Sequence, residues 1–248
     1  MIRGLYTAAS GLWVNQFRAD VLTNNLANLN TPGFRAADPE AVSFPEIMVN
    51  QTIYGSTTPG TATGFMGTGV AAAATVFDLS PGPYQNTGIP TDLAILGEGF
   101  FAVQTPQGTL YTRQGNFGVD AEGRLVTQDG YLVLGEDGPI TVGSERFDVA
   151  PDGTITSNGK PVGRLLVVDP GNGATLHQIA GTMFQSTLPL QPLAGHQVRQ
   201  GTLESSNVDE TAAMVDLLTA LRAYEASAQA IQAENETLQK ATNDVGRV

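Results

Sequence analysis

The stretch NNLANLNTPGF, residues 24–34, ends a helical pattern with a fixed turn. Apolar and small residues recur before it at alternating spacings of three and four, which is a heptad seam. We expect a helix over residues 4–29, roughly 39 Å long at 1.5 Å per residue. It should stop at Thr31-Pro32, because the residue before proline is pushed out of the α region, and Gly33 can supply the positive φ of a type II turn. The seam consists of Leu5, Ala8, Leu12, Asn15, Ala19, Leu22, Leu26 and Leu29.

A second seam with the same alternation occupies the other end of the chain. It follows SSNVDE, residues 205–210, in which Asn207 can cap a helix while Glu210 reaches back as in a capping box. One asparagine stands in each seam, Asn15 and Asn235, where a lone amide tends to fix register. The sequence therefore predicts a second long helix. Its seam consists of Met214, Leu217, Leu221, Tyr224, Ala228, Ile231, Asn235, Leu238, Thr242 and Val245.

Between the seams the period changes to short apolar runs separated by PQG, AEG, QDG and EDG. These are strand and hairpin-turn signals at about ten-residue spacing. They predict an antiparallel β domain over residues 92–187, with a dozen or fewer short strands up to residue 170. Residues 35–91 are expected to form an extended connector rich in Gly, Thr and Ala, and residues 188–202 a return connector.

The predicted fold class is therefore α+β. Long heptad helices at the N- and C-terminal ends, within residues 1–34 and 203–248, form a coiled-coil-like core domain, and the central domain is antiparallel and all-β.

Composition excludes several classes of partner. The formal net charge is -12, with 12 basic and 24 acidic residues, so a phosphate-binding footprint is missing and no nucleic acid is expected. The chain has no cysteine, which removes disulfides and thiolate metal sites. No apolar run is long enough for a membrane span, and MIRGLYTAASGLWVNQ lacks the core of a secretory signal. We expect neither a membrane span nor a cleaved Sec signal.

No catalytic, cofactor or metal site is predicted. Gly97-x-Gly99 lies in a strand-like run and opens no helix, so it is not a dinucleotide loop. His177 and His196 are nineteen residues apart, without a nearby acidic cluster of metal-ligand type. Most acidic residues of the β region lie in turns, where Asp-Gly is favoured for backbone reasons. The chain is expected not to be an enzyme.

The amides before the turn point to contacts between molecules. Asn24 and Asn28 are i and i+4 neighbours, with Asn25 and Gln16 beside them. Asparagine is a middling helix former, so a merely solvated face would favour other residues. We expect these amides to be buried against neighbouring subunits. The predicted subunit-interface residues are Leu5, Leu12, Asn15, Leu22, Asn24, Asn25, Leu26, Asn28, Thr31, Pro32, Gly33, Phe34, Ser206, Asn207, Val208, Leu217, Leu221, Tyr224, Ile231, Asn235 and Leu238.

Four segments in order resemble bacterial flagellar rod and hook proteins. They are MIRGLYTAASG with NNLANLNTPGF, GTGV at 67–70, the β text at 92–135, and QGTLESSNVDETAAMVDLLTALRAYEASAQAIQ at 200–232. The resemblance implies a structural axial subunit whose terminal helices pair in the inner core of a helical tube. It also implies as partners copies of itself, other rod proteins and the flagellar type III export apparatus, and a location in the basal-body rod.

Hook proteins of this family are usually larger, which favours a rod component, and the compact segments after residue 138 lean towards the proximal-rod type over the distal-rod type. An alternative from another class is a secreted β-rich hydrolase or lyase of cell-wall glycan, with terminal helices that drive oligomerisation.

Overall fold

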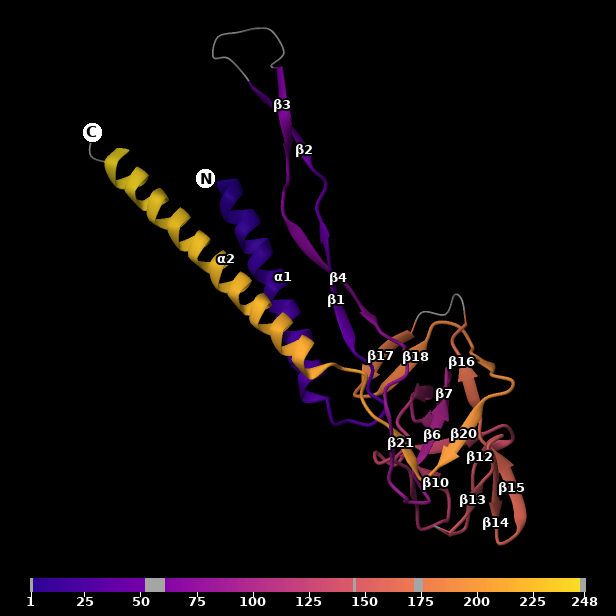
Figure 1. The fold of residues 1–248 in the computed structure, drawn as a ribbon. Helices are drawn as coiled ribbons and strands as arrows, with labels where there is room; N and C mark the ends of the chain where they lie inside the picture. The colour runs from indigo at the N-terminus through magenta and orange to yellow at the C-terminus, as the bar shows by residue number, and fades with distance from the viewer. Residues whose placement is uncertain (1, 52–60, 145, 172–175, 246–248) are drawn as a thin grey trace. The chain divides into compact units, whose positions relative to one another are not determined.

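A computed structural model describes residues 2–51, 61–144, 146–171 and 176–245. The chain forms two compact units, both built from separate stretches of sequence. Unit 1 comprises Met1–Leu26, Ala37–Phe77 and Glu210–Val248, and unit 2 comprises Ala27–Ala36 and Asp78–Asp209. Figure 1 shows the helices of unit 1 and the strands of both units.

Unit 1 contains the two long helices, α1 (Ile2–Ala27) and α2 (Glu210–Val245). The length expected for the first helix is confirmed at 26 residues, but the helix ends at Ala27, before the predicted stop. Residues 28–30 already form a turn, and the Thr31 amide donates to the Asn28 carbonyl at 3.1 Å. Asparagines disfavour the helix here because their amides compete for backbone hydrogen bonds.

The two helices lie side by side and run antiparallel (Figure 1). Ala19 and Leu22 of α1 share a small buried cluster with Ala220 of α2. Nearer the start of α1, a Cβ added at Gly11 would stand 3.6 Å from Ser227 Oγ. Contacts therefore move forward along α2 as they move back along α1.

The predicted heptad coiled-coil core is wrong. Ala213 and Ala220 are buried in α2, whereas Met214 and Leu221 are 47% and 42% exposed, and Asn235 is also exposed. The side of α2 that faces α1 therefore keeps only part of the predicted row: Leu217 packs against the buried cluster, whereas Met214 and Leu221 lie outside it. Small side chains let the helix backbones approach closely, and the row predicted for α2 includes neither Ala213 nor Ala220.

The strands of unit 1 lie in residues 37–77, where the sequence predicts an extended connector. They form two antiparallel pairs, β1 with β4 and β2 with β3, as the segment runs out and returns (Figure 1). The turn between β2 and β3, part of the Gly/Thr-rich text, lies outside the described residues. The strands are β1 (Ala37–Ser43), β2 (Ile47–Gln51), β3 (Thr61–Met66) and β4 (Val70–Phe77).

Unit 2 confirms the predicted central antiparallel β domain. Its strands are β5 (Tyr84–Asn86), β6 (Leu93–Leu96), β7 (Phe100–Thr105), β8 (Gly108–Thr112), β9 (Gly118–Val119), β10 (Leu125–Val126), β11 (Leu132–Gly135), β12 (Gly138–Pro139), β13 (Asp148–Val149), β14 (Thr154–Ser157), β15 (Lys160–Arg164), β16 (Val167–Asp169), β17 (Leu176–Ala180), β18 (Met183–Ser186), β19 (Gln191–Pro192), β20 (Gln197–Gln200) and β21 (Thr202–Glu204).

A ten-stranded sheet organises unit 2, with the path β17-β18-β8-β7-β11-β10-β9 and with β12, β16 and β19 beside it. β13, β14 and β15 form a separate sheet, and two further pairs join β20 to β6 and β21 to β5. One cluster of sixteen buried apolar side chains packs between these strands. In that cluster the rings of Phe101 and Phe117 meet edge to face at 5.1 Å.

The hairpin from β14 to β15 shows why turn chemistry located the strands. Ser157 pairs with Lys160, so the loop holds only Asn158 and Gly159. Both have positive φ, 52° and 76°. A two-residue loop that matches the strand twist requires this conformation, and Asn-Gly adopts it most readily.

Candidate assembly surface

The asparagine-rich end of α1 places Asn25 inside the chain. Its side-chain amide donates to the Ala37 carbonyl at 2.8 Å, and its oxygen accepts from the Ala37 amide at 3.0 Å. The side chain is buried, so within unit 1 it ties the last turn of α1 to the start of β1. Asn24, one position earlier, is exposed. Of this pair, Asn24 is the residue whose side chain is exposed.

The Thr31–Phe34 turn forms as the sequence predicts. The Phe34 amide donates to the Thr31 carbonyl at 3.3 Å, and Gly33 has a φ of 69°. A Cβ on Gly33 would stand 2.4 Å from the Arg113 carbonyl carbon, so no larger residue fits without movement. Phe34 is fully buried in unit 2. The turn is an internal anchor, with Asn28, Thr31 and Pro32 half-buried around it.

Three charged side chains are buried beside this turn. Glu204 pairs with Arg35 at 2.7 Å and with Arg113 at 2.9 Å, and all three side chains are almost fully buried. The Gly82 amide also donates to Glu204 at 2.9 Å, and the Arg113 guanidinium donates to the carbonyls of Gly97 and Gly99. Burial lowers the pKa of Arg113, while the Glu204 carboxylate opposes that shift. We call Arg35, Arg113 and Glu204 the buried triad.

The triad joins segments that are far apart in the sequence but belong to unit 2. Sequence reasoning missed it, because single charged residues in turn-rich text carry no periodic signal. Its net charge is positive, and two nitrogens of Arg35, Nε and Nη1, are buried with no hydrogen-bond partner among the described residues. An uncompensated Arg35 or Arg113 would be costly in such a place, so Glu204 is the residue on which this junction depends.

The residue expected to cap α2 has a different role. Asn207 accepts from the Ala36 amide at 2.7 Å and donates to the carbonyls of Asp78 and Ser80. It thereby joins the first stretch of unit 2 to the beginning of the second, and the predicted capping role is wrong. Its neighbours Ser206 and Val208 are buried and half-buried.

The predicted interface residues of the helices fall into two groups. Most are buried or half-buried within the single chain, and two of them, Leu22 and Leu217, meet in the cluster shared by α1 and α2. Leu221 and Asn235 are exposed. The buried or half-buried members are Leu5, Leu12, Asn15, Leu22, Leu26, Leu217, Tyr224, Ile231 and Leu238.

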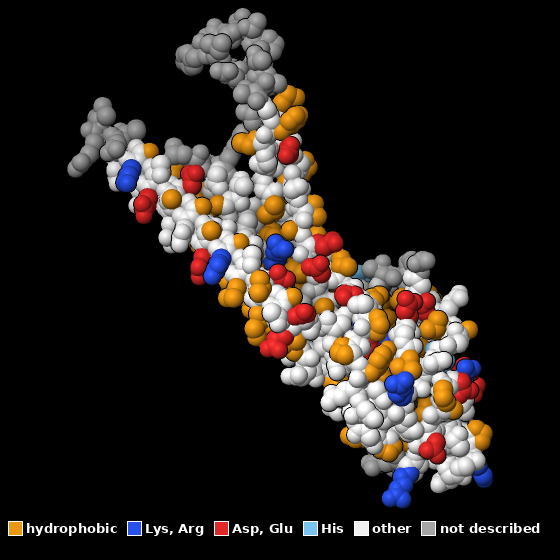
Figure 2. Space-filling view, in the orientation of Figure 1, with side chains coloured by type: hydrophobic (Ala, Val, Ile, Leu, Met, Phe, Trp, Pro, Cys, Tyr) orange, Lys and Arg blue, Asp and Glu red, His pale blue; other side chains and the backbone are white. Residues whose placement is uncertain are grey.

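Unit 1 carries an exposed apolar surface that the sequence pattern only partly predicts. Large apolar side chains lie exposed on both helices and along the strands, where Figure 2 shows them in view. Trp13 on α1 is 62% exposed and Phe65 on β3 is 72% exposed. A large amount of exposed apolar surface is typical of interaction sites. The exposed large apolar residues of unit 1 are Tyr6, Trp13, Val42, Phe44, Ile47, Met48, Phe65, Val76, Met214, Val215, Leu218 and Leu221.

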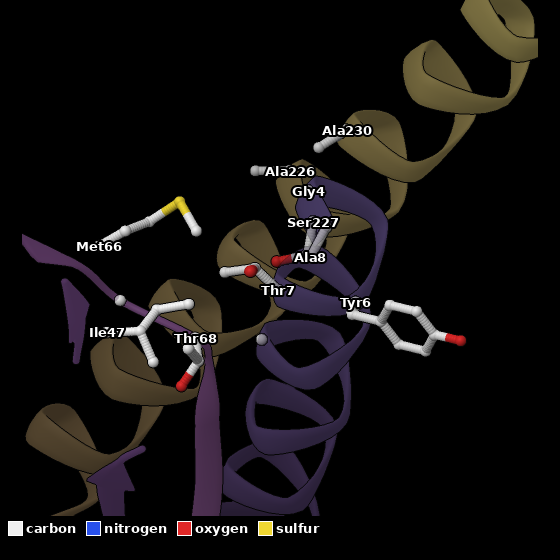
Figure 3. Close-up of a pocket in the computed structure, with 12 residues that line it drawn as sticks. Gly4, Tyr6, Thr7, Ala8, Ile47, Met66, Thr68, Ala226, Ser227 and Ala230 are labelled. Atoms are coloured by element: carbon white, nitrogen blue, oxygen red, sulfur yellow. The ribbon is translucent and has the colours of Figure 1, made fainter. Parts of the chain in front are cut away.

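A groove of about 740 Å³ lies between α1, α2 and the strands of unit 1. In Figure 3, Thr7, Ile47 and Met66 point towards this space and Tyr6 points away from it. No charged residue lines the groove. Its lining residues are Gly4, Tyr6, Thr7, Ala8, Gly11, Ile47, Met66, Gly67, Thr68, Ala226, Ser227 and Ala230, which we call the hairpin groove.

The described residues show no arrangement for metal chemistry or for crossing a membrane. Across them, no three His, Asp or Glu side chains gather closely enough to hold a metal ion. Neither described helix combines the length and the apolar character that a membrane span requires. His196 is buried with Nδ1 2.7 Å from the Leu193 carbonyl, so this histidine serves packing. The features of unit 1 suited to protein contacts are its exposed apolar residues and the hairpin groove.

Three family models match successive parts of the chain. Residues 5–35 match the model described as "Flagella basal body rod protein". Residues 94–159 match "Flagellar hook protein FlgE/F/G D1 domain", and residues 199–244 match "Flagellar basal body rod FlgEFG protein C-terminal".

Curated relatives match over nearly the whole length. The flagellar basal-body rod protein FlgG of Bacillus subtilis is 34% identical, over 98% of this chain and 99% of its own. The protein of the same name from Borreliella burgdorferi is 34% identical, over 98% of both chains. The rod protein FlgF of Caulobacter vibrioides is 33% identical over the full length of both. FlgG and FlgF relatives thus match almost equally.

Proposed function

Since this chain belongs to the family of flagellar basal-body rod proteins, we propose that its copies and other rod proteins assemble with one another through unit 1. The chain is a structural subunit of the flagellar rod and not an enzyme, and its place is the flagellar basal body. None of the matches reported above is a glycan hydrolase or lyase, so that alternative has no support.

The observation that supports assembly through unit 1 is the contrast between the two units. Unit 2 packs sixteen buried apolar side chains into one cluster, whereas the buried cluster of unit 1 holds Ala19, Leu22 and Ala220. Unit 1 meanwhile exposes twelve large apolar residues. Its apolar surface exceeds what one chain covers, and burial of such surface is the main driving force for association.

The mechanical role follows from the kind of contact. A rod that transmits torque from motor to hook needs the same contact repeated from copy to copy. Interfaces that join two different surfaces build an open helix when the rotation between copies does not close a ring. Long helices packed against neighbours make such contacts rigid.

The experiment is a deletion strain of the native host, from which basal bodies are isolated and imaged. We expect incomplete rods and loss of motility, with both restored by the wild-type chain. Complete rods without this protein would contradict the proposed function.

We also propose export through the flagellar type III apparatus, which the family membership supports. The measurement is secretion of the chain into the medium by a strain that exports rod proteins but cannot complete the rod. Equal secretion after inactivation of the export ATPase and its gate would contradict this route.

A further inference from the structure

The hairpin groove has the shape of a receptor for large side chains. Its floor is formed by small residues, with Ala8 from α1 and Ala226 and Ala230 from α2, and one wall is formed by Ile47 and Met66 (Figure 3). Ala226 and Ala230 are exposed, so the floor is open to an incoming group. None of the lining residues is charged, so the walls that an apolar group meets are uncharged.

A matching set of side chains lies elsewhere on the same helix. Met214, Leu218 and Leu221 are 47%, 56% and 42% exposed. Their spacing of four and three places them in one row along α2. We call these three residues the α2 stripe. A row of apolar side chains at i, i+4 and i+7 is the pattern by which a helix enters an apolar groove.

The stripe cannot reach the groove of its own chain. Leu218 and Ala226 are eight residues apart on one helix, about 12 Å along the axis and roughly 80° around it. Ala230 is a further turn away. Both features belong to the rigid helix α2, so the groove and the stripe stay apart in every monomer. An occupant that carries this stripe has to be a second copy.

We propose that the α2 stripe of one copy packs into the hairpin groove of the next copy in the rod. The inference rests on the proposed function, because it names the contact by which copies associate. The two surfaces differ, and each copy that inserts its stripe leaves its own groove open. The contact therefore propagates head to tail and does not close a symmetric dimer.

A single contact of this size is weak. Three side chains in one groove bury much less than the roughly 1,000 Å² that a stable pair needs. The contact should therefore appear as association above a threshold concentration and not as a stable dimer in dilute solution.

Cysteine cross-linking tests the contact, because the wild-type chain has no cysteine. Basal bodies are isolated from deletion cells that express two differently tagged chains, one with Leu218→Cys and one with Ala226→Cys. Mild oxidation should join the two tags, since a disulfide needs Cα atoms within about 7 Å. The matched control pairs Leu218→Cys with Gln232→Cys, at an exposed position further along α2.

A mixed cross-link at least several times stronger than in the control supports the proposal. Rods that contain both tagged chains but give no mixed cross-link overturn the contact and leave the proposed function standing. Absence of the wild-type chain from the rods overturns both. Motility of each single variant shows whether it has folded and assembled.

Filling the groove is an independent test that does not depend on oxidation. Ala226→Trp should raise the threshold concentration for association of the full-length chain by about tenfold or more, because it blocks burial of large apolar side chains. Ala226→Ser should leave it within about twofold. Circular dichroism compares folding of both variants, since residue 226 is exposed. An unchanged threshold in a folded Ala226→Trp chain would refute the contact.

Discussion

At the scale of single residues, the buried triad makes the sharpest prediction about stability. Glu204→Gln removes the charge that compensates Arg35 and Arg113, and leaves two cations buried. Breaking a buried pair in this way is strongly destabilising, so we expect the free energy of unfolding to fall by about 3–5 kcal/mol. Urea denaturation of the full-length chain, monitored by far-UV circular dichroism, measures this change in the free energy of unfolding.

The control for this prediction is a carboxylate in an exposed ion pair. Glu136 stands 3.4 Å from Arg164, and both side chains are well exposed. Glu136→Gln should change the free energy of unfolding by about 1 kcal/mol or less, because exposed ion pairs contribute little. Equal effects of the two substitutions would show that the triad is not the junction inferred here.

Substitutions at the neighbouring residues Asn24 and Asn25 distinguish an effect on folding from an effect on assembly. Asn25→Ala removes two hydrogen bonds and leaves the backbone polar groups of Ala37 without these partners, so unit 1 should lose about 1–3 kcal/mol of stability. Asn24→Ala changes an exposed side chain and should affect unfolding less. If Asn24 contacts a neighbouring subunit, its substitution should instead lower motility. Chemical denaturation and swimming assays on both variants distinguish the two roles, and a larger stability loss in Asn24→Ala would contradict them.

At the scale of elements, the helices should be less protected than the sheet. The buried cluster between α1 and α2 is small, while β7 and β8 lie inside the main core of unit 2. Opening free energy follows local burial, so amides of α1 should exchange faster than those of β7 in a verified monomer. Hydrogen exchange with mass spectrometry measures this. Strong, equal protection of α1 and β7 in the monomer would show that unit 1 is complete without partners.

Turn residues in the sequence correctly predicted the sheet, whereas the spacing of apolar residues predicted the wrong buried side of α2. The Asn158-Gly159 loop is dictated by backbone conformation, which two residues carry by themselves. The side of α2 that is buried depends on which side chains allow the partner helix to approach closely. Ala220 is buried there, whereas Leu221 is 42% exposed. Residues 37–77 are rich in Gly, Ala and Thr, and their apolar residues do not alternate regularly enough to predict the strands. Buried charges such as Glu204 follow from tertiary packing alone.

At the scale of the whole molecule, charge opposes assembly. A formal net charge of -12 makes copies repel one another, and the repulsion is screened as salt shortens the Debye length from about 10 Å at 0.1 M to 3 Å at 1 M. The threshold concentration for association should therefore fall as sodium chloride rises over this range. Analytical sedimentation of the full-length chain at several salt concentrations checks it. A threshold that rises with salt would indicate that attraction between charges, and not apolar burial, holds the copies together.

The order of segments along the chain determines which unit can be completed first. Unit 2 draws on residues up to Asp209, whereas unit 1 needs α1 from the beginning, the strands of residues 37–77, and α2 from Glu210 onward. If the proposed export delivers the N-terminal end first, α1 cannot pack until α2 has arrived, and the surface proposed to bind other copies is completed last. On that route, a subunit in transit lacks the complete surface proposed to bind other copies. The apolar surface of unit 1 is therefore completed only after the whole chain has been released, where the chain emerges.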